Sequence, residues 1–415
     1  MRACTFTVLI VLAIASACST SEKKKDYASL PDEQLHKIAD SLAQAYIITD
    51  GHVDLPYRLK VKNFRLDREY LGIPVETKEG DFDFVRAKKG GLDAPFMSIY
   101  IPSRYQQQAD MGKALADSLI NMIRFIADSI PDKFALAGSP DEIIANTKAG
   151  KISLPMGMEN GAPIGNDLAN VKYFYDRGIR YITLTHGKDN QICDSSYDTL
   201  NTSNGLSPFG EKVVAEMNRV GIMVDISHVS DSTFYDVMKL AKAPCIASHS
   251  SCRYYTPGFQ RNMNDDMIKA LAKNGGVIQI NFGASFLDSV ARRNDALRDS
   301  LEKILQEKKL TSADADAQPI IDQFARDHKE LFSDVERVAD HIDHVVKLVG
   351  IDHVGIGSDY DGVGDSLPAG LKDVSQYPNL IYVLLKRGYS PADIEKICSG
   401  NVFRVWNQVI AVAGH

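Results

Sequence analysis

Short apolar runs rich in β-branched residues recur along the chain and alternate with segments of helical periodicity. Eight of these runs are typical of strands: Ile47–Thr49, Pro95–Ile101, Ser153–Met158, Tyr181–Thr185, Ile222–Ile226, Pro244–Ser248, Gly276–Phe282 and His353–Ser358. Most are separated by segments with apolar residues at three- and four-residue intervals, such as Pro208–Arg219 and Asp265–Asn274. This alternation indicates parallel βαβ units, whose strands are buried on both faces. Eight such units predict a (β/α)8 TIM-type barrel. The alternative is a doubly wound open sheet, but no glycine-rich phosphate loop follows the first strand.

Three segments lie outside this repeat. Pro31–Tyr46 has helical apolar spacing and predicts a helix before the first strand. Residues 60–94 are rich in charge and glycine, which predicts a long loop or a small hairpin. Residues 287–350 predict a helical insertion before the last strand, followed by the last barrel helices, with most charges on solvated faces.

The first residues are typical of a targeting segment. Arg2 precedes an apolar run from Thr5 to Ala17, and these 13 residues are too few to span a bilayer as a helix. Small residues then lead into Cys18, which resembles a bacterial lipoprotein signal with a lipid on that cysteine. We therefore expect a signal at residues 1–17, a lipid-anchored tether at 18–30 and one barrel domain at 31–415. The alternative is a signal peptide cut nearby, without a lipid.

This reading places the protein outside the cytoplasm of a bacterium. It would be held at the cell envelope, on the periplasmic or surface side, only by the N-terminal lipid, or it would be secreted. Disulfides are possible there. The four cysteines beyond Cys18, however, form no metal-binding pair and their spacing dictates no bridge: Cys193, Cys245, Cys252 and Cys398.

Composition limits the classes of function further. The 415 residues are 44% hydrophobic and 24% charged, values ordinary for a globular protein rather than a disordered or collagen-like one. The formal net charge of −7 argues against a sequence-independent nucleic-acid binder, which needs a basic surface. We therefore expect no nucleic-acid partner.

The first strand closes in a pattern that can bind metal. Its end carries His52 and Asp54, and period-two geometry would point both side chains to the same side. Imidazole and carboxylate together suit a borderline ion such as zinc. The pattern alone is weak evidence, because His341 and Asp343 repeat it. That second copy lies within a helical pattern, where residues two apart diverge, and it predicts a solvated helix face.

Five further strands also end in polar side chains. These are Glu159 after the third run, His186 after the fourth, His228 after the fifth, His249 after the sixth and Asp359 after the eighth. In a barrel these ends converge on the face where active sites are built. Each residue alone would be an ordinary core or loop residue, but their joint placement on equivalent strand ends indicates one site.

Charge balance in such a site calls for metal. Asp54, Glu159 and Asp359 would place three negative charges in a partly desolvated mouth, where repulsion raises pKa values. One divalent ion leaves this trio negative, whereas two ions and a bridging hydroxide bring the sum to zero. This predicts two metal ions bridged by Glu159. Several imidazoles favour two Zn²⁺ over magnesium, and this reasoning leaves manganese and cobalt open.

Six motifs make the resemblance to a known family specific. The chain resembles the membrane (renal) dipeptidases, peptidase family M19 within the amidohydrolase-like barrels, from about Ile48 to Val409. The motifs that carry this resemblance are, in order, GHVDLP, MGMENG, LTHGKDN, DISHVS, ASHSSCR and GIGSDYDGV.

The resemblance implies a set of metal ligands. His52, Asp54 and Glu159 would hold one zinc ion. Glu159, shared with His228 and His249, would hold the second.

The same resemblance implies roles towards substrate. His186 would contact the substrate and stabilise the oxyanion, and Arg261 would bind the substrate's free carboxylate. Asp359 falls at the acid/base carboxylate, with Asp361 as its main rival. The aromatic residue that lines the family's substrate site is not recoverable in the stretch GASFLD, which follows Asn281 and Phe282.

We therefore expect a zinc-dependent dipeptidase in which a metal-bridging hydroxide attacks the peptide bond of dipeptides, including those with a C-terminal D-residue. One alternative is a related binuclear barrel hydrolase that acts on another amide, a lactone or a phosphoester. Another is a catalytically silent, metal-stabilised binding protein on the cell envelope. Members of the resembled family are often dimers, so a homodimer is an open expectation.

Overall fold

Eight parallel strands form a closed barrel. The computed structural model describes residues 27–61, 73–106, 109–311, 314–328 and 332–414. The sheet has the order β1-β2-β5-β6-β7-β8-β9-β10. Its strands are β1 Ile48–Val53, β2 Leu92–Tyr100, β5 Met156–Glu159, β6 Ile179–Thr183, β7 Met223–Asp225, β8 Ile246–Ala247, β9 Val277–Ile280 and β10 Val354–Ile356. A parallel bridge joins Val53, at the end of β1, to Tyr360 just beyond β10. This closure confirms the predicted TIM-type barrel.

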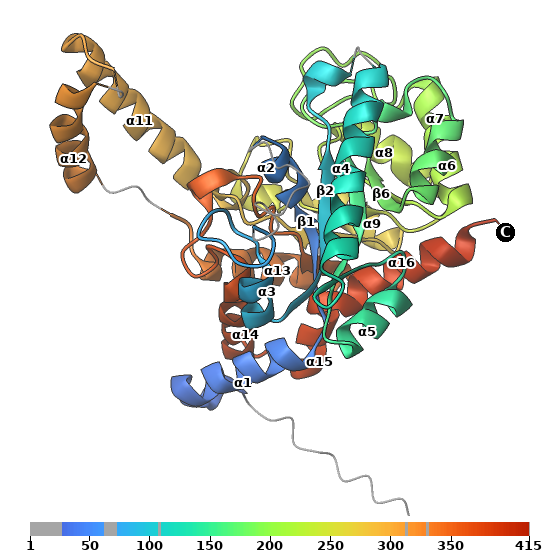
Figure 1. Ribbon diagram of the computed structural model, residues 1–415, viewed down its shortest axis with the longest axis horizontal. Helices are drawn as coiled ribbons and strands as arrows, with labels where there is room; N and C mark the ends of the chain where they lie inside the picture. The colour runs from blue at the N-terminus through green and yellow to red at the C-terminus, as the bar shows by residue number, and fades with distance from the viewer. Residues whose placement is uncertain (1–26, 62–72, 107–108, 312–313, 329–331, 415) are drawn as a thin grey trace, which may run out of the picture.

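Helices surround this barrel (Figure 1). Their bounds are α1 Asp32–Ala45, α2 Leu55–Val61, α3 Phe84–Gly90, α4 Ala109–Ser129, α5 Pro140–Lys148, α6 Ala169–Asp176, α7 Pro208–Val220, α8 Asp231–Leu240, α9 Asp265–Lys273, α10 Ala284–Leu287, α11 Val290–Glu307, α12 Gln318–Asp327, α13 Val335–Val349, α14 Tyr377–Lys386, α15 Pro391–Glu395 and α16 Asn401–Val412. Several begin at side-chain caps that the sequence provides. Ser207 and Pro208 start α7, Ser230 starts α8 and Asn264 starts α9.

Aromatic side chains fill the interior of the barrel. Phe96 of β2 packs between Tyr181 of β6 and Trp406 of α16, with ring centroids 5.4 and 5.2 Å away. All three side chains are fully buried. Gly157 leaves room for the ring of Tyr181, because a Cβ at that position would lie 1.9 Å from it. The phenol of Tyr181 can therefore extend through the core towards the strand ends.

The structure confirms the eight predicted strands and the helix before them, with one division. Pro155 splits the predicted run Ser153–Met158 into two strands. The first, β4 (Ile152–Leu154), pairs with β3 (Phe134–Leu136) in a separate two-stranded sheet, and only β5 belongs to the barrel. Proline has no N–H to donate, which is consistent with the change of sheet at this residue.

The expectation of a loop or small hairpin over residues 60–94 is confirmed for residues 73–83, which form turns, and is wrong from residue 84 onward; residues 62–72 lie outside the described residues. The described part of this segment contains α3, and β2 begins at Leu92. The side chain of Asp83 caps α3 by accepting a hydrogen bond from the Arg86 N–H, and Gly91 ends the helix in the left-handed conformation. These are ordinary start and stop signals.

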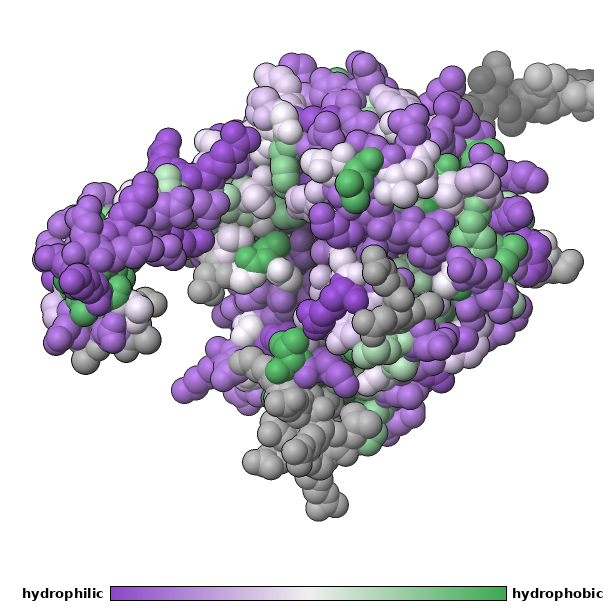
Figure 2. All heavy atoms as spheres, turned by 90° about the horizontal axis from the view of Figure 1, so that it is seen from above, coloured by the Kyte–Doolittle hydropathy of each residue, from purple (hydrophilic) through white to green (hydrophobic). Residues whose placement is uncertain are grey.

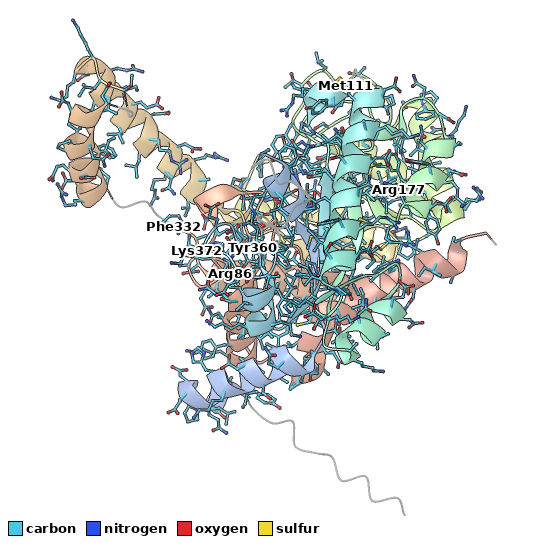
Figure 3. All side chains as sticks on the ribbon, in the orientation of Figure 1. Arg86, Met111, Arg177, Phe332, Tyr360 and Lys372 are labelled. Atoms are coloured by element: carbon cyan, nitrogen blue, oxygen red, sulfur yellow. The ribbon has the colours of Figure 1, made fainter. Side chains whose placement is uncertain are left out.

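The predicted insertion before the last strand is present as α11 and α12. These helices project from the barrel as a hairpin (Figure 1), and their outer surface is largely hydrophilic (Figure 2). Beyond α12, Phe332 lies beside Lys372 on the barrel body (Figure 3), with the Lys372 ammonium nitrogen 3.7 Å from the ring centroid. The hairpin thus extends outward from the body of the barrel (Figure 1).

The N-terminal segment begins before the described part of the chain, whereas the cysteines after Cys18 lie within it. Residues 1–17, Cys18 and the tether up to residue 26 lie outside the described residues, so the targeting segment stays a prediction. Within the described ranges, no helix combines the length and apolar character needed to span a bilayer. These four cysteines are buried, and none of them forms a disulfide bond within the described residues.

The expectation of a solvated face at the second H-x-D pattern was half wrong. His341 is fully buried in α13, whereas Asp343 faces outward and pairs with Arg387. The His341 Nδ1 accepts a hydrogen bond from the Cys252 N–H, which leaves its Nε2–H to donate to the Leu287 carbonyl oxygen. The side chains of His341 and Asp343 point in different directions from the helix, as expected, but His341 points towards the barrel instead of into solvent.

This histidine makes stability depend on pH. Burial lowers the pKa of His341 to about 4, so the folded protein keeps the ring neutral while the unfolded chain takes up a proton below about pH 6.5. Stability should therefore fall as the pH drops from 6.5 towards 4, by about 2 kcal/mol at pH 5 from this group. Urea unfolding of His341→Gln at pH 7.5 and pH 5 should show a smaller loss than the unmodified chain. The exposed His328→Gln is the control, and equal losses in all three proteins would contradict the assignment.

Candidate metal centre and active site

The polar strand ends predicted from the sequence meet at one face of the barrel. His52 lies in β1, Glu159 ends β5, and the other residues follow their strands directly. They surround a cavity of about 490 Å³ whose lining includes Asp54, Glu159, His186, His228 and Asp359. His52 and His249 are also fully buried against Glu159. The structure thus brings together all seven strand-end residues.

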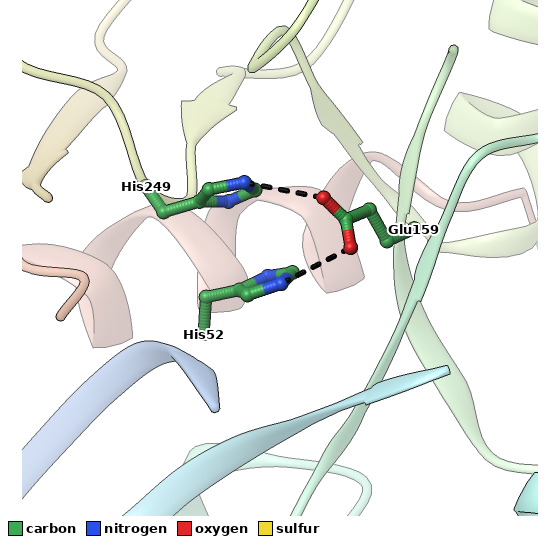
Figure 4. A group of neighbouring side chains, drawn as sticks. All are labelled: His52, Glu159 and His249. Carbon is green, nitrogen blue, oxygen red and sulfur yellow. Dashed lines mark ion pairs between the residues drawn. The ribbon is translucent and has the colours of Figure 1, made fainter. Parts of the chain in front are cut away.

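Glu159 is the centre of this cluster. Its Oε1 lies 3.0 Å from His228 Nε2, 3.3 Å from His249 Nε2 and 3.6 Å from His186 Nε2. Its Oε2 lies 3.3 Å from His52 Nε2. Figure 4 shows the rings of His52 and His249 stacked beside the carboxylate, with centroids 3.8 Å apart. One carboxylate therefore reaches imidazoles from four strands.

The charge states around Glu159 suit a metal ligand set. Burial opposes charge on Glu159, but the surrounding histidines hold its pKa well below the usual range. Burial also lowers the pKa values of His228 and His249 well below their usual range, which keeps both rings neutral. Carboxylate and neutral imidazole are the forms that bind metal.

The hydrogen bonds of His52 test the fit of a cation directly. The Tyr181 hydroxyl donates to the Gly51 carbonyl oxygen at 3.0 Å, so it accepts from His52 Nδ1–H at 2.8 Å. In the neutral ring this arrangement places the lone pair on Nε2, which faces Glu159 Oε2 at 3.3 Å. Burial opposes charge on His52, but Tyr181 and the carboxylates of Glu159 and Asp54 raise its pKa well above the usual value, so this position favours positive charge, from a proton or from a metal ion. Two acceptors that face each other at this distance fit a cation between them.

Proximity defines three groups of candidate ligands among the described residues: His52 with Glu159 and His249, Glu159 with His186 and His228, and His52 with Asp54 and Asp359. Glu159 belongs to two of them, which suits a bridging ligand. These groups differ from the ligand sets that the family resemblance implies. The resemblance puts His249 with His228, whereas in the structure His249 lies in the group of His52. His186, which the resemblance excludes as a ligand, joins His228.

The two candidate acid/base residues occupy different environments. The Asp359 Oδ2 accepts a hydrogen bond from Asn281 at 2.7 Å, and burial, together with Asp54 and Glu159, raises the pKa of Asp359 to about 8. The Asp361 carboxylate instead accepts from the Asp81 N–H at 2.7 Å and pairs with Arg58 at 3.3 Å. Both residues have positive φ angles, near 65°, so the chain turns sharply between them. Only Asp359 belongs to a candidate metal group.

Arg261 is buried against Ser250 and His249, and it is not among the residues that line the cavity. Its Nη1 donates to Ser250 Oγ at 2.6 Å and its Nη2 to the His249 carbonyl oxygen at 2.8 Å. The guanidinium carbon lies 5.1 Å from the ring centroid of Phe286, and its Nε–H has no partner among the described residues. One donor edge of this guanidinium thus remains available.

Aromatic residues that sequence reasoning missed form the cavity wall. They are Tyr57, Tyr100, Tyr197 and Phe286. Phe286 lies in the stretch GASFLD, where the family's aromatic residue was not recoverable from the motif. Tyr100 ends β2, so its place at a strand end was a usable signal. Tyr57, Tyr197 and Phe286 lie on segments beyond the strands, where no periodicity predicts direction.

Comparison with known proteins identifies the family. The model of the family "Membrane dipeptidase (Peptidase family M19)" matches residues 14–415. The chain belongs to this family. It is 32% identical to "Dipeptidase 3" of Mus musculus over 91% of this chain and 67% of that protein. It is 31% identical to "Dipeptidase tcpJ" of Claviceps purpurea over 92% of this chain and 81% of that protein.

A solved structure supports the same assignment. The crystal structure of the probable dipeptidase PvdM from Pseudomonas aeruginosa superposes with a TM-score of 0.76 at 26% identity, covering 92% of this chain and all of that one. The predicted family, fold and enzyme class are thus confirmed. This family member is a metallo-dipeptidase, a hydrolase of peptide bonds, and its grouped histidines and carboxylates indicate a metal cofactor.

The central position of Glu159 predicts the effect of its removal. Glu159→Gln keeps the volume but replaces a carboxylate oxygen by an amide, so metal affinity should fall by more than about 100-fold, beyond the usual cost of losing an outer-shell partner. Metal content after dialysis, measured by mass spectrometry, checks this result. The control is Glu302→Gln on the exposed face of α11. Full metal content in Glu159→Gln would place the metal site elsewhere.

Proposed function

We propose that this dipeptidase uses two zinc ions held by five side chains, with Glu159 shared between them: His52, Asp54, Glu159, His228 and His249. The observation that carries this proposal is the convergence of four imidazoles on the two oxygens of Glu159 at 3.0–3.6 Å. So many nitrogen donors favour zinc over magnesium. Metal analysis of the purified protein separates zinc from manganese and cobalt. Divalent ions at such a site lower the pKa of coordinated water towards neutrality.

His186 is proposed to stabilise the charge that develops on the carbonyl oxygen of the peptide bond. It lines the cavity beside Glu159, with its ring edge against Tyr100. Burial lowers the pKa of His186, so the ring is neutral near pH 7 and offers one N–H. A fixed donor in a partly dry cavity stabilises a developing oxyanion more than water does.

Asp359 is proposed to move the proton to the leaving amine. Burial raises the pKa of Asp359 to about 8 and that of Asp361 to about 7, so both can carry a proton near neutrality and their contacts separate them. The bond from Asn281 fixes Oδ2, so the other oxygen is the one free to exchange a proton. Asp361 is committed to Asp81 and Arg58 and serves to hold the loop.

The substrate proposed for this site is a dipeptide with a free C-terminal carboxylate. The unpartnered Nε edge of Arg261 can donate to that carboxylate, and Phe286 packs over the guanidinium. A cavity of about 490 Å³ accommodates a small ligand of this size. Acceptance of a D-residue at the C-terminal position is proposed from the family resemblance, and paired L-Xaa-L-Xaa and L-Xaa-D-Xaa substrates test it directly.

The acid/base assignment predicts a contrast between two neighbouring variants. Asp359→Asn should retain the bound metal and lower kcat by about 10²- to 10⁴-fold, because the proton donor is lost. Asp361→Asn should mainly lower the melting temperature, because it weakens the contacts to Arg58 and Asp81. Metal content, kcat and melting temperature of both variants decide between them. A fully active Asp359→Asn would transfer the role to Asp361.

The proposed role of Arg261 predicts that its replacement weakens binding of the substrate's C-terminal carboxylate. Arg261→Gln should lower kcat/KM for a free dipeptide by about 10- to 100-fold, the value of hydrogen bonds to a charged group. A C-terminally amidated dipeptide should be a poor substrate for the unmodified enzyme and should lose little further in the variant. If the variant still discriminates between the two substrates, Arg261 does not bind the carboxylate. Preference for an amidated or lactone substrate would favour the related barrel hydrolase instead.

A further inference from the structure

Two buried aspartates lie beneath the metal centre without lining its cavity. Asp50 lies in β1 and Asp225 ends β7, and both side chains are fully buried. Neither belongs to the cavity wall or to a candidate metal group among the described residues. Each carboxylate instead accepts hydrogen bonds from two or more neighbouring strand ends.

Asp225 joins three consecutive strand ends. Its Oδ1 accepts from the Ser227 N–H at 3.1 Å and from the Ser248 N–H at 2.9 Å. Its Oδ2 accepts from Thr183 Oγ1 at 2.5 Å and from Ser248 Oγ at 2.6 Å. Thr183 ends β6, Ser227 precedes His228, and Ser248 follows β8. One carboxylate thus determines the spacing of the segments that carry His186, His228 and His249.

The bond from Ser248 extends this control to the ring of His249. Ser248 has one hydroxyl proton and donates it to Asp225, so its oxygen accepts from His249 Nδ1–H at 2.7 Å. The lone pair of His249 is then on Nε2, which faces Glu159 Oε1 at 3.3 Å. The chain Asp225–Ser248–His249 therefore selects the tautomer that can bind metal.

Asp50 makes the equivalent connection on the other side of the barrel. Its Oδ1 accepts from the His52 N–H at 3.1 Å and from the Ser358 N–H at 2.9 Å. The Tyr377 hydroxyl donates to its Oδ2. These bonds join the segment that carries His52 to the segment that carries Asp359, across the closure between β1 and β10.

We propose that Asp225 and Asp50 are positioning residues of the metal centre, Asp225 for His228 and His249 and Asp50 for His52 and Asp359. This inference rests on the proposed function, because positioning has meaning only if these side chains bind metal. Outer-shell partners of metal-bound histidines raise the basicity of the ligand and fix its orientation. Asp225 acts on His249 through a single hydroxyl, which makes its contribution separable from general packing.

The decisive variants change the Asp225–Ser248–His249 chain one bond at a time. Asp225→Asn and Ser248→Ala should each lower the affinity for one metal ion by about 10- to 100-fold, and excess zinc should restore part of kcat. Ser248→Thr retains the hydroxyl and should restore the affinity. Ser248→Ala leaves the Asp225 bonds to both backbone N–H groups in place, so it stays informative if Asp225→Asn fails to fold.

A buried carboxylate at the opposite end of the barrel provides the matched control. Asp93, near the start of β2, accepts a hydrogen bond from the Ile48 N–H at 3.2 Å, so Asp93→Asn should bind metal like the unmodified chain. Affinity is measured by competition with a zinc chelator, alongside the melting temperature of the metal-free proteins. Unchanged zinc affinity in both Asp225→Asn and Ser248→Ala would overturn the positioning role of Asp225 and leave the proposed function intact. An unmodified chain that binds no metal would instead overturn the proposed function.

Discussion

A buried carboxylate that several strands share is the constraint around which this barrel is arranged. Glu159 is almost inaccessible to solvent, and an isolated charge in such a place would cost several kcal/mol. Here imidazole nitrogens from four strands lie within 3.0–3.6 Å of its oxygens. The sharp turns after the strands serve this convergence, since His228 and Asp359 both adopt positive φ angles. Backbone strain of this kind persists where the surrounding structure compensates for it.

The position of the site could be predicted because parallel strands all end on the same side. Once the apolar runs were recognised as strands, the polar residue after each one was directed to a common face, and no knowledge of loop geometry was needed. The same logic did not distinguish Asp359 from Asp361. Both follow β10 within a sharp turn, and their tertiary contacts separate them: Asp361 binds Arg58 and Asp81, whereas Asp359 accepts from Asn281 beside the candidate metal ligands.

The missed features depended on tertiary partners. Burial of His341 follows from the packing of α13 against Cys252 and Leu287, which are remote in sequence. Apart from Tyr100 at the end of β2, the aromatic wall comes from segments outside the strands, whose direction no repeat determines. Asp225 begins the motif DISHVS and Asp50 directly precedes the motif GHVDLP, but a carboxylate that accepts hydrogen bonds from neighbouring strand ends has no sequence pattern of its own. Short-range signals did exist for α3, in its Asp83 cap and Gly91 terminus, and the charged composition of the segment obscured them.

The contact between Val53 and Tyr360 has a consequence for how the enzyme matures. It joins segments more than 300 positions apart, so the ring of strands closes only after the chain has been synthesised as far as Tyr360. Contacts of such long range form slowly, because their loop entropy is lost before they contribute stability. A ribosome-bound fragment ending before Ser358 would already carry every histidine of the cluster, but it would lack the proposed acid/base carboxylate, Asp359, and the last wall of the cavity. On the proposed assignment of Asp359, a product that terminates before this residue does not hydrolyse peptides.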